Sequence, residues 1–452
     1  MDNICELTIK ELTTKLNKKE ISVRELVQFY LSRIQGIDQG EDGLNSVLEI
    51  NPDALDIADR LDKEHVENRG GLFGVPILLK DNIDTADHMH TSAGSLALAD
   101  SIAKEDAEIV KVLRAKGAVI LGKTNMTEFA NYMAHGMPAG YSSRGGQVKS
   151  PYKKGEDPSG SSTGSAVAVA SNLCMASIGT DTSNSIISPG LKNGIVGYRP
   201  SMGTMSQKGI IPISFTCDTA GPMTLTVEDA GILFAEITGN RGPLDRLPDH
   251  RELTLGINEW ALKNMNAEDG KKAEMIIKGF KKSNIRLKFF NLEPVSKEDL
   301  KVIQRYEFKY SINKYLSGLP QGYKIRSLRD IIEFNNRHEN QTLRYGQSHL
   351  IDAHDNTLGN LKEVEYIEML QERDRKEKQV KEILKEVDAC IMFRENLTLQ
   401  FTGMPMITIP HGLYNDGMPY GISITSLTDT QLLRCSLCLE KMIGRRVPPQ
   451  LG

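Results

Sequence analysis

Three polar stretches carry side chains and backbone groups that are able to do chemistry. Lys80 follows the apolar run 75–79; a lysine there either emerges into solvent or, if buried, has a lowered pKa and becomes a candidate base. Residues 160–165, GSSTGS, are small and let backbone approach backbone or ligand closely. Residues 179–187, GTDTSNSII, place Ser185 after residues whose N–H groups are able to converge. Taken singly, each stretch also fits a surface loop or a helix cap.

The elements that must position these residues are predicted helices and strands that alternate along the chain. Ser22 and Glu25 form a capping box that predicts a helix from Val23 onward. Helix-then-strand pairs follow, and two apolar strands, 405–410 and 421–426, come near the end. This alternation favours an α/β domain with a largely parallel sheet. The predicted pairs are 106–116 with 118–121, 164–174 with 175–181, 271–284 with 285–290, and 376–388 with 389–393.

Shifts in composition divide the chain without breaking it into separate domains. We expect one domain over 1–452, in which highly charged residues form a helical insertion and the last segment completes the sheet. From its position and composition, the insertion is a candidate cap over the pocket. The four parts are an N-terminal helical region at 1–68, a catalytic core at 70–240, the charged helical insertion at 258–387, and C-terminal strands and a helix at 388–452.

The overall composition excludes several classes of protein. A net charge of −4 over 452 residues gives no electrostatic reason to expect nucleic acid. No apolar run approaches the roughly 18 residues that cross a membrane, and the N-terminus lacks the apolar segment of a signal peptide, so we expect a cytoplasmic protein. The pair Cys435 and Cys438 has no second pair beside it, and His88 and His90 lack a third ligand. We therefore expect no metal and no cofactor, and the oligomeric state is left open.

Several motifs in fixed order resemble the amidase signature family. LLKDNID contains Lys80, GSSTGS is similar to the family loop GSSGGS, and GTDTSNSII is similar to GTDTGGSIR. The spacing from Ser161 to Ser185 also matches, and the resemblance covers nearly the whole chain. Residues 142–152 and 209–223 are similar to bacterial peptide amidases, which remove the C-terminal amide of peptides. The resemblance implies a three-layer α/β/α sandwich with a mixed, mostly parallel twisted sheet.

The resemblance also implies a role for each matching residue. Ser185 would be the nucleophile, Ser161 would relay its proton, and Lys80, in its neutral form, would be the final base. Ammonia would leave from an acyl-enzyme, which water would hydrolyse. Backbone N–H groups would bind the oxyanion, at Thr182, Ser183, Asn184 and Ser185. Hydrogen bonds that support the site are expected from Ser162, Thr180 and Asp181.

The chain departs from the family pattern at four positions. Thr163 stands for a glycine, Ser183 and Asn184 stand for the Gly-Gly pair, and Ile187 stands for an arginine. Asparagine tolerates positive φ better than serine does. Three further hypotheses are a broader acyl-amide or ester hydrolase, an amidotransferase subunit, and a catalytically idle protein that binds a ligand. The changes motivate the idle protein, and Ser183, Asn184 and Ile187 count against the amidotransferase subunit.

Overall fold

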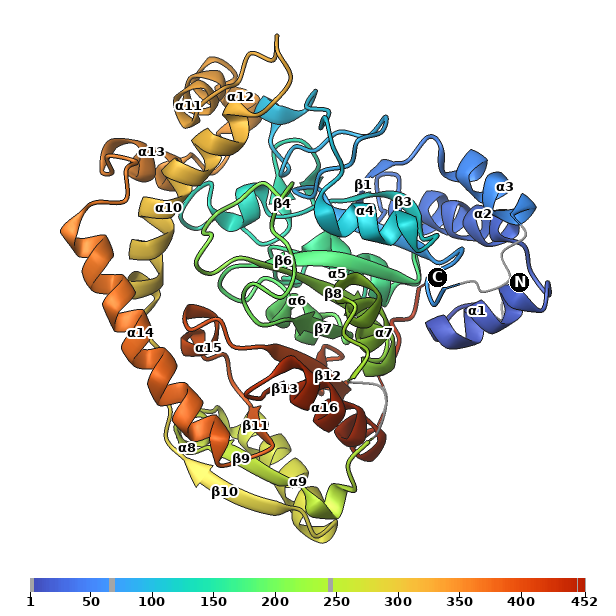
Figure 1. The fold of residues 1–452 in the computed structure, drawn as a ribbon, viewed down its shortest axis with the longest axis vertical. Helices are drawn as coiled ribbons and strands as arrows, with labels where there is room; N and C mark the ends of the chain where they lie inside the picture. Colours follow the sequence, from blue (N-terminus) through green and yellow to red (C-terminus); the bar gives the residue numbers. More distant parts are fainter. Residues whose placement is uncertain (1–3, 65–69, 243–246, 445, 452) are drawn as a thin grey trace.

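A computed structural model describes residues 4–64, 70–242, 247–444 and 446–451, and a large twisted sheet runs through it (Figure 1). Within these residues the sheet has eleven strands, and β4 (Tyr141–Ser142) pairs with β5 (Gly146–Gln147) as a separate ribbon. In spatial order the strands are β1 (Val47–Ile50), β3 (Val119–Thr124), β2 (Pro76–Lys80), β6 (Ala176–Asp181), β8 (Thr219–Thr224), β7 (Val196–Arg199), β12 (Met406–Leu413), β13 (Pro419–Thr425), β11 (Ala389–Met392), β9 (Thr254–Asn258) and β10 (Arg286–Phe290).

The sheet is mixed, but it is not mostly parallel, and this part of the prediction was wrong. Among the described strands, four neighbouring pairs are parallel and six are antiparallel. Parallel pairing occurs at β3–β2–β6 and at β11–β9–β10, where helices lie between consecutive strands in the sequence. In the middle, β7 leads to β8 and β12 leads to β13 without an intervening helix, so these strands pair antiparallel.

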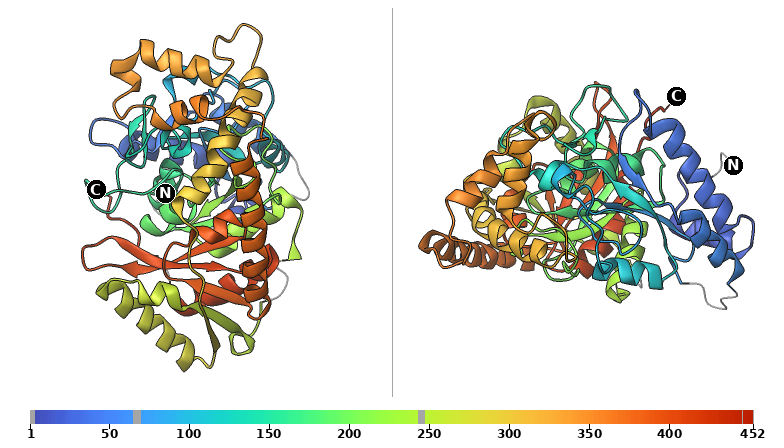
Figure 2. Two further views of the ribbon diagram at one scale, coloured as in Figure 1. Left: turned by 90° about the vertical axis from the view of Figure 1, so that its left-hand side faces the viewer. Right: turned by 90° about the horizontal axis from the view of Figure 1, so that it is seen from above.

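Helices cover both faces of the sheet, as the two side views show (Figure 2). In strand β7, successive side chains point to opposite faces of the sheet, so neighbouring residues contact different helix layers. Tyr198 packs edge to face on Phe234, with 5.4 Å between ring centroids. Gly197 faces the other way, and a Cβ on it would lie 2.6 Å from the Ile186 carbonyl oxygen. One layer contains α4 (Glu108–Ala115), α7 (Val227–Thr238) and α16 (Asp429–Ile443), and the other contains α5 (Thr163–Ala170) and α6 (Ile187–Lys192).

The N-terminal helices lie beside the β1 end of the sheet, on the right of Figure 1. The predicted capping box is confirmed, because the Ser22 side chain accepts from the Glu25 N–H and the Glu25 side chain accepts from the Ser22 N–H. Residues 1–3 and 65–68 of the predicted N-terminal region lie outside the described residues. The helices are α1 (Ile9–Asn17), α2 (Val23–Arg33) and α3 (Ala54–Lys63).

The charged segment 258–387 is not a single helical insertion. Strand β10 lies within it and forms the last strand of the sheet, so only the residues after Phe290 leave the sheet. Of the helices that follow, α10, α13 and α14 lie on the left of Figure 1, and α11 and α12 lie at its top. In order, the helices of the segment are α8 (Glu259–Lys263), α9 (Ala267–Lys282), α10 (Lys297–Ser317), α11 (Leu328–Arg337), α12 (Glu339–Thr342), α13 (Ser348–Asp355) and α14 (Val364–Lys385), and α15 (Leu397–Phe401) comes after β11.

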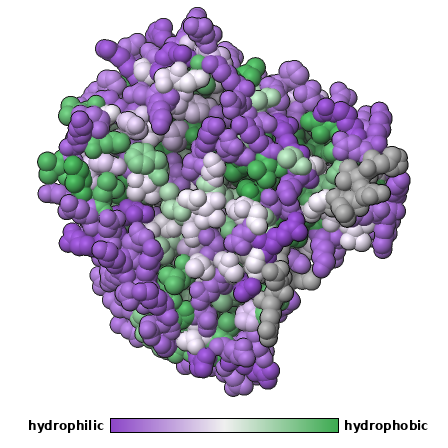
Figure 3. All heavy atoms as spheres, in the orientation of Figure 1, coloured by the Kyte–Doolittle hydropathy of each residue, from purple (hydrophilic) through white to green (hydrophobic). Residues whose placement is uncertain are grey.

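The surface in the view of Figure 3 is hydrophilic over most of its area, with hydrophobic residues gathered in separate patches. Within the described ranges, no helix combines the length and the apolar character that a membrane crossing requires. The apolar side chains are instead packed in buried clusters on the two faces of the sheet and under α10.

Candidate active site

Lys80 is the last residue of β2 and is completely buried. Its Nζ atom lies 2.8 Å from Ser161 Oγ, 2.9 Å from Ser162 Oγ and 3.1 Å from the Thr180 carbonyl oxygen. Burial disfavours the charged form and lowers the pKa of Lys80 to about 7. The structure therefore places a lysine that is partly neutral at physiological pH against two serine hydroxyls.

The hydrogen bonds around Ser162 show which neighbours of Lys80 are able to donate a hydrogen bond to it. Ser162 Oγ donates to the Thr180 carbonyl oxygen (2.9 Å) and accepts from the Thr180 N–H (3.1 Å). The single hydroxyl proton of Ser162 is thus engaged, so Ser162 Oγ only accepts a hydrogen bond from Lys80. The Thr180 carbonyl oxygen has no proton and also only accepts. Ser161 Oγ is the one neighbour of Nζ that is able to donate to the lone pair of neutral Lys80.

Ser161 sits on a loop that is packed tightly against its surroundings. The Gly160–Ser161 peptide bond is cis, and the Ser161 carbonyl accepts from the Thr127 N–H at 3.2 Å. A Cβ on Gly160 would lie 2.6 Å from the hydroxyl oxygens of both Thr127 and Thr163. Thr163, which replaces a glycine of the family pattern, therefore occupies space beside this loop rather than inside the contact between Ser161 and Lys80.

Ser185 is 6% exposed and borders a cavity, where its hydroxyl makes no hydrogen bond to any described residue. The two serine loops are joined through their backbones, because the Ser162 N–H donates to the Ser185 carbonyl at 3.2 Å. The structure thus brings Lys80 and Ser161 into direct contact. It places Ser185 on the adjoining loop, with its hydroxyl accessible from the cavity.

Asp181 organises the loop that carries Ser185. Its two carboxylate oxygens accept from the Asn184 N–H (3.0 Å) and from the Ile186 N–H (2.7 Å). Arg199, which is fully buried, donates to the same carboxylate at 2.7 Å and to the Asp181 carbonyl oxygen at 2.9 Å. A buried carboxylate with this many donors keeps the loop in one shape.

The predicted oxyanion hole needs one correction, because the Asn184 N–H is not free. It donates to Asp181, so it supports the loop instead of facing a ligand. The N–H groups of the other three predicted donors have no acceptor among the described residues. Two of them, Ser183 and Ser185, belong to residues that line the cavity. The third, Thr182, uses its side chain to donate to Asp218 at 2.7 Å.

Asn184 replaces a glycine of the family pattern and has a φ of 129°, which L-residues rarely adopt. Its side chain is held from both ends: its amide nitrogen donates to Glu395 Oε1 (2.6 Å), and its amide oxygen accepts from the side chain of Gln400 (3.0 Å). These contacts, from chain more than 200 residues away, stabilise a backbone conformation that glycine would adopt without help.

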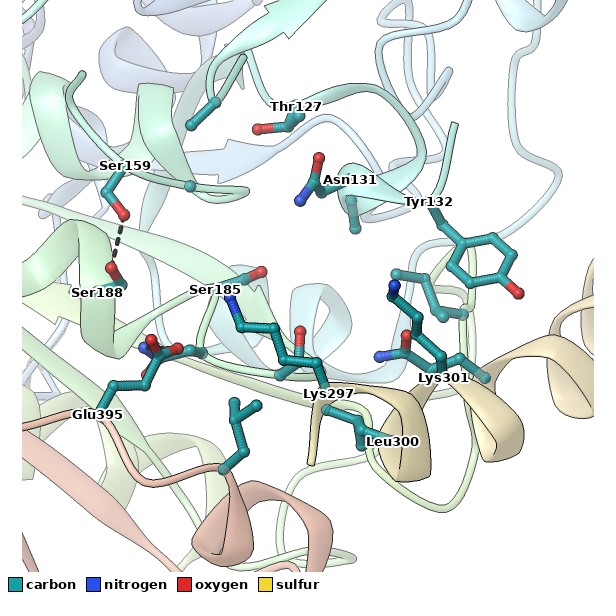
Figure 4. A pocket seen from close by; sticks show the side chains of 18 of the residues that line it. Thr127, Asn131, Tyr132, Ser159, Ser185, Ser188, Lys297, Leu300, Lys301 and Glu395 are labelled. Atoms are coloured by element: carbon teal, nitrogen blue, oxygen red, sulfur yellow. Dashed lines mark hydrogen bonds between the residues drawn. The ribbon is translucent and has the colours of Figure 1, made fainter. Parts of the chain in front are cut away.

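The cavity beside Ser185 has a volume of about 430 Å³. Figure 4 shows Ser185, Asn131 and Lys297 pointing into it, with Glu395 on one side and Lys301 on the other. One wall includes Ala130 and Asn131 of η3 (Glu128–Asn131), and both residues have positive φ. The opposite wall is the first part of α10, from the segment predicted to cap the pocket.

Sequence reasoning missed Arg199, Glu395 and Gln400. Arg199 lies at the end of an apolar strand, the same signal that singled out Lys80, whereas the other two carry no local signal. Ile187, which replaces the arginine of the family pattern, is buried at the start of α6. Within the described residues, no group of three or more His, Cys, Asp or Glu side chains is placed to hold a metal ion.

A family model for amidases matches residues 25–393. The chain belongs to the amidase family. It is therefore a hydrolase that acts on amides. It is 35% identical to a probable amidase of Arabidopsis thaliana, over 99% of this chain and 92% of the relative.

Two solved structures share the whole fold. One is an amidase family protein from Bacillus anthracis, with 34% identity, a TM-score of 0.90 and coverage of 100% of this chain and 93% of that one. The other is a peptide amidase from Stenotrophomonas maltophilia, with 32% identity, a TM-score of 0.88 and 99% coverage of both chains. Both matches agree with the α/β architecture and with the family that the sequence motifs indicated.

Proposed function

We propose that this amidase hydrolyses linear carboxamides through an acyl-enzyme on Ser185, with the C-terminal amide of peptides as the preferred substrate. The observation that carries this proposal is the hydrogen-bond pattern of Lys80, which leaves Ser161, among the described residues, as the only hydroxyl free to donate to the lysine. The similarity to a peptide amidase over the full length of both chains supports the choice of substrate.

In the proposed mechanism, neutral Lys80 takes the Ser161 hydroxyl proton while Ser161 takes the proton of Ser185. The Ser185 oxygen then attacks the amide carbon, and the carbonyl oxygen becomes an oxyanion that accepts from the free N–H groups of the 182–185 loop. Collapse breaks the C–N bond. The proton held by Lys80 returns through Ser161 to the departing nitrogen, and ammonia leaves.

Water completes the cycle by the same route. It loses a proton through Ser161 to Lys80 and attacks the acyl carbon, and the returning proton restores the Ser185 hydroxyl as the carboxylic acid leaves. Each proton moves between side chains of this protein and the substrate or water, so the reaction as written uses no metal and no cofactor. Adding a chelator is expected to leave the rate unchanged.

The size of the cavity supports the proposal that the acyl part of the substrate binds in it. Ammonia is a leaving group with one heavy atom, whereas the cavity beside Ser185 measures about 430 Å³. An acyl group as large as a peptide residue therefore has room on the side of Ser185 that faces α10. Residues of this cavity would then select among acyl groups rather than among leaving groups.

The test is ammonia release from a panel of peptide C-terminal amides, free asparagine and glutamine, acetamide, benzamide and long-chain fatty amides. We expect release from peptide amides, and Ser185→Ala lowers kcat by on the order of 10⁶-fold. Release from simple amides alone would favour the broader acyl-amide hydrolase. No release, together with no labelling of Ser185 by a fluorophosphonate, would overturn the enzyme mechanism in favour of a ligand-binding protein.

A further inference from the structure

Three polar residues of α10 face the cavity from one stripe of the helix. Lys297, Lys301 and Gln304 are four and three residues apart, a spacing that places side chains on one face. All three line the same cavity as Ser185. They supply two ammonium groups and one amide on the wall that faces the acyl part of a substrate.

Lys297 lies at the N-terminus of a helix, where a positive charge is unfavourable. It is the first residue of α10, directly after the N-cap Ser296, and the positive end of the helix dipole repels a cation there. Within the described part of the chain, no carboxylate lies within 4.0 Å of its Nζ atom, and no hydrogen bond holds it. Lys301 has one acidic partner, Glu298 at 2.9 Å, and that carboxylate is 78% exposed and screened by solvent.

Gln304 is 8% exposed, and its side-chain amide makes no hydrogen bond to any described residue. Among the described residues, the buried side-chain atoms that lack a hydrogen-bond partner do not include those of Gln304, so its amide is open to the cavity and free to bind a group there. Because Gln304 borders the cavity, a bound ligand is the partner that the site provides for it. This observation does not depend on the charges of the two lysines.

The acidic groups of the cavity come from segments other than α10. Burial raises the pKa of one of them, Glu395, and this carboxylate is close enough to Lys297 for the charge of the lysine to lower its pKa in opposition. Asp157 and Glu395 also border it, and Glu395 is bound through Oε1 to the Asn184 side chain. Figure 4 shows Glu395 beside Ser159 and Ser188, across the cavity from Lys301 and Tyr132. The cavity therefore has an acidic end near the Ser159–Ser188 pair and a donor-rich wall along α10.

We infer that the α10 wall, formed by Lys297, Lys301 and Gln304, binds a carboxylate on the acyl part of the substrate. The preferred substrates would then be carboxamides that carry a second, anionic group, such as N-succinylated or acidic peptide amides. This inference rests on the proposed function and adds the substrate class. An ammonium group binds a carboxylate with a charge-assisted hydrogen bond, and an amide N–H adds another.

The test compares two amides that differ only in charge: N-succinyl-phenylalaninamide and N-(4-methylpentanoyl)-phenylalaninamide, in which an isopropyl group replaces the carboxylate. We expect the wild-type kcat/KM to be about tenfold higher for the succinyl amide, as two partly exposed ion pairs would give. The double variant Lys297→Met/Lys301→Met should remove most of this ratio. Because both amides are measured on one preparation, partial misfolding does not change the ratio.

Two further variants sharpen the test. Lys314→Met removes a lysine of the same helix that does not line the cavity, and it should leave the ratio as in the wild type. Glu298→Gln removes the acid that competes for Lys301, and it should raise the ratio. An amide with a 4-aminobutanoyl group in place of the succinyl group should be the poorest substrate of the three.

Each outcome bears on one claim. Equal kcat/KM values for the succinyl and 4-methylpentanoyl amides, or a preference for the 4-aminobutanoyl amide, would overturn the inference and leave the amidase mechanism intact. If none of the amides releases ammonia, the proposed function fails, and calorimetric binding to Ser185→Ala decides the inference. Tighter binding of the succinyl amide, lost in the lysine double variant, would support the carboxylate site, and equal binding would contradict it.

Discussion

The protein buries two lysines on neighbouring strands, and the proposed mechanism uses only one of them as a base. Lys80 ends β2 and Lys123 lies near the end of β3, and both are completely buried. The register of the two strands pairs Lys80 with Thr124, and Thr124 contacts Ser165 of α5 at 2.7 Å. Since neighbouring residues of a strand point to opposite faces, Lys123 lies on the other side of the sheet from Lys80.

The partners of the two lysines explain the difference. Lys80 meets two hydroxyls and a carbonyl oxygen, in the field of the Asp181 and Asp218 carboxylates. One of the hydroxyls belongs to Ser162, whose N–H donates to the Ser185 carbonyl. Lys123 donates to the Ile83 carbonyl and to Thr91, and it lies in the field of the Asp81 and Asp84 carboxylates. Burial lowers the pKa of both lysines, but only Lys80 contacts Ser161, which the proposed mechanism uses to relay the proton of Ser185. Burial therefore lowers the pKa of a lysine, and the groups around the lysine determine whether its neutral form is able to accept a proton in a reaction.

The largest expected effect is the loss of catalysis in Lys80→Met. Removing a general base costs about 10²–10⁴-fold in rate. We expect kcat for a peptide amide to fall by about 10³-fold, while the unfolding midpoint in urea stays close to that of the wild type, since the groups that hydrogen-bond to Lys80 are neutral. Activity within tenfold of the wild type would contradict the assignment of Lys80 as the base.

The second prediction concerns the stability of Lys123→Met. Removing a buried cation leaves the Asp81 and Asp84 carboxylates without its charge, which costs about 3–5 kcal/mol for a buried pair. We expect urea unfolding to show a loss of about 3 kcal/mol, with kcat per folded molecule kept. A variant that is as stable as the wild type but inactive would show that the two lysines had been assigned the wrong way round.

The pH dependence of kcat/KM gives the third prediction. Burial lowers the pKa of Lys80 to about 7, and the neutral form is the active one. The rate should therefore fall about tenfold for each pH unit below 7 and level off above it. Lys123→Met should show the same midpoint, because Lys123 takes no part in the proton transfer. A flat profile from pH 5 to 9 in the wild type would exclude Lys80 as the titrating group.

The smallest expected effect comes from Ser162→Ala. This change removes one acceptor from Lys80 and two hydrogen bonds with the Thr180 backbone, and a net loss of about 1 kcal/mol corresponds to roughly fivefold in kcat. The charged lysine loses more than the neutral one, so the midpoint of the pH profile should move below 7. Ser165→Ala is the matched control, since Ser165 contacts Thr124 and not Lys80. An upward shift of the midpoint would show that Ser162 does not stabilise the charged lysine.

The sequence alone predicted the residues around Lys80 well, because each one lies within a motif. Lys80, Ser162, Thr180 and Asp181 lie together as the motifs indicated, and Ser161 contacts the lysine directly. The α/β class and the mixed sheet were also predicted. The antiparallel centre of the sheet was not, because those strands lack the helix-then-strand alternation on which the prediction was based.

Contacts between distant parts of the chain were beyond the reach of sequence patterns. The Asn184 side chain is held by Glu395 and Gln400, and no local feature of residues 395–400 indicates this role. The engagement of the Asn184 N–H by Asp181 depends on the shape of the loop, not on its composition. Lys297 and Lys301 looked like part of an ordinary charged helix until the fold placed them beside Ser185.

The most direct test of the central claim is the rate at which a fluorophosphonate labels the protein between pH 5 and 9, followed by intact-protein mass spectrometry. It requires no knowledge of the substrate. A single adduct on Ser185 is predicted, with a rate that rises through pH 7 in the wild type and in Lys123→Met, and that is at least about 10²-fold lower in Lys80→Met. Labelling at another residue, or labelling of Ser185 that is equally fast without Lys80, would contradict the mechanism.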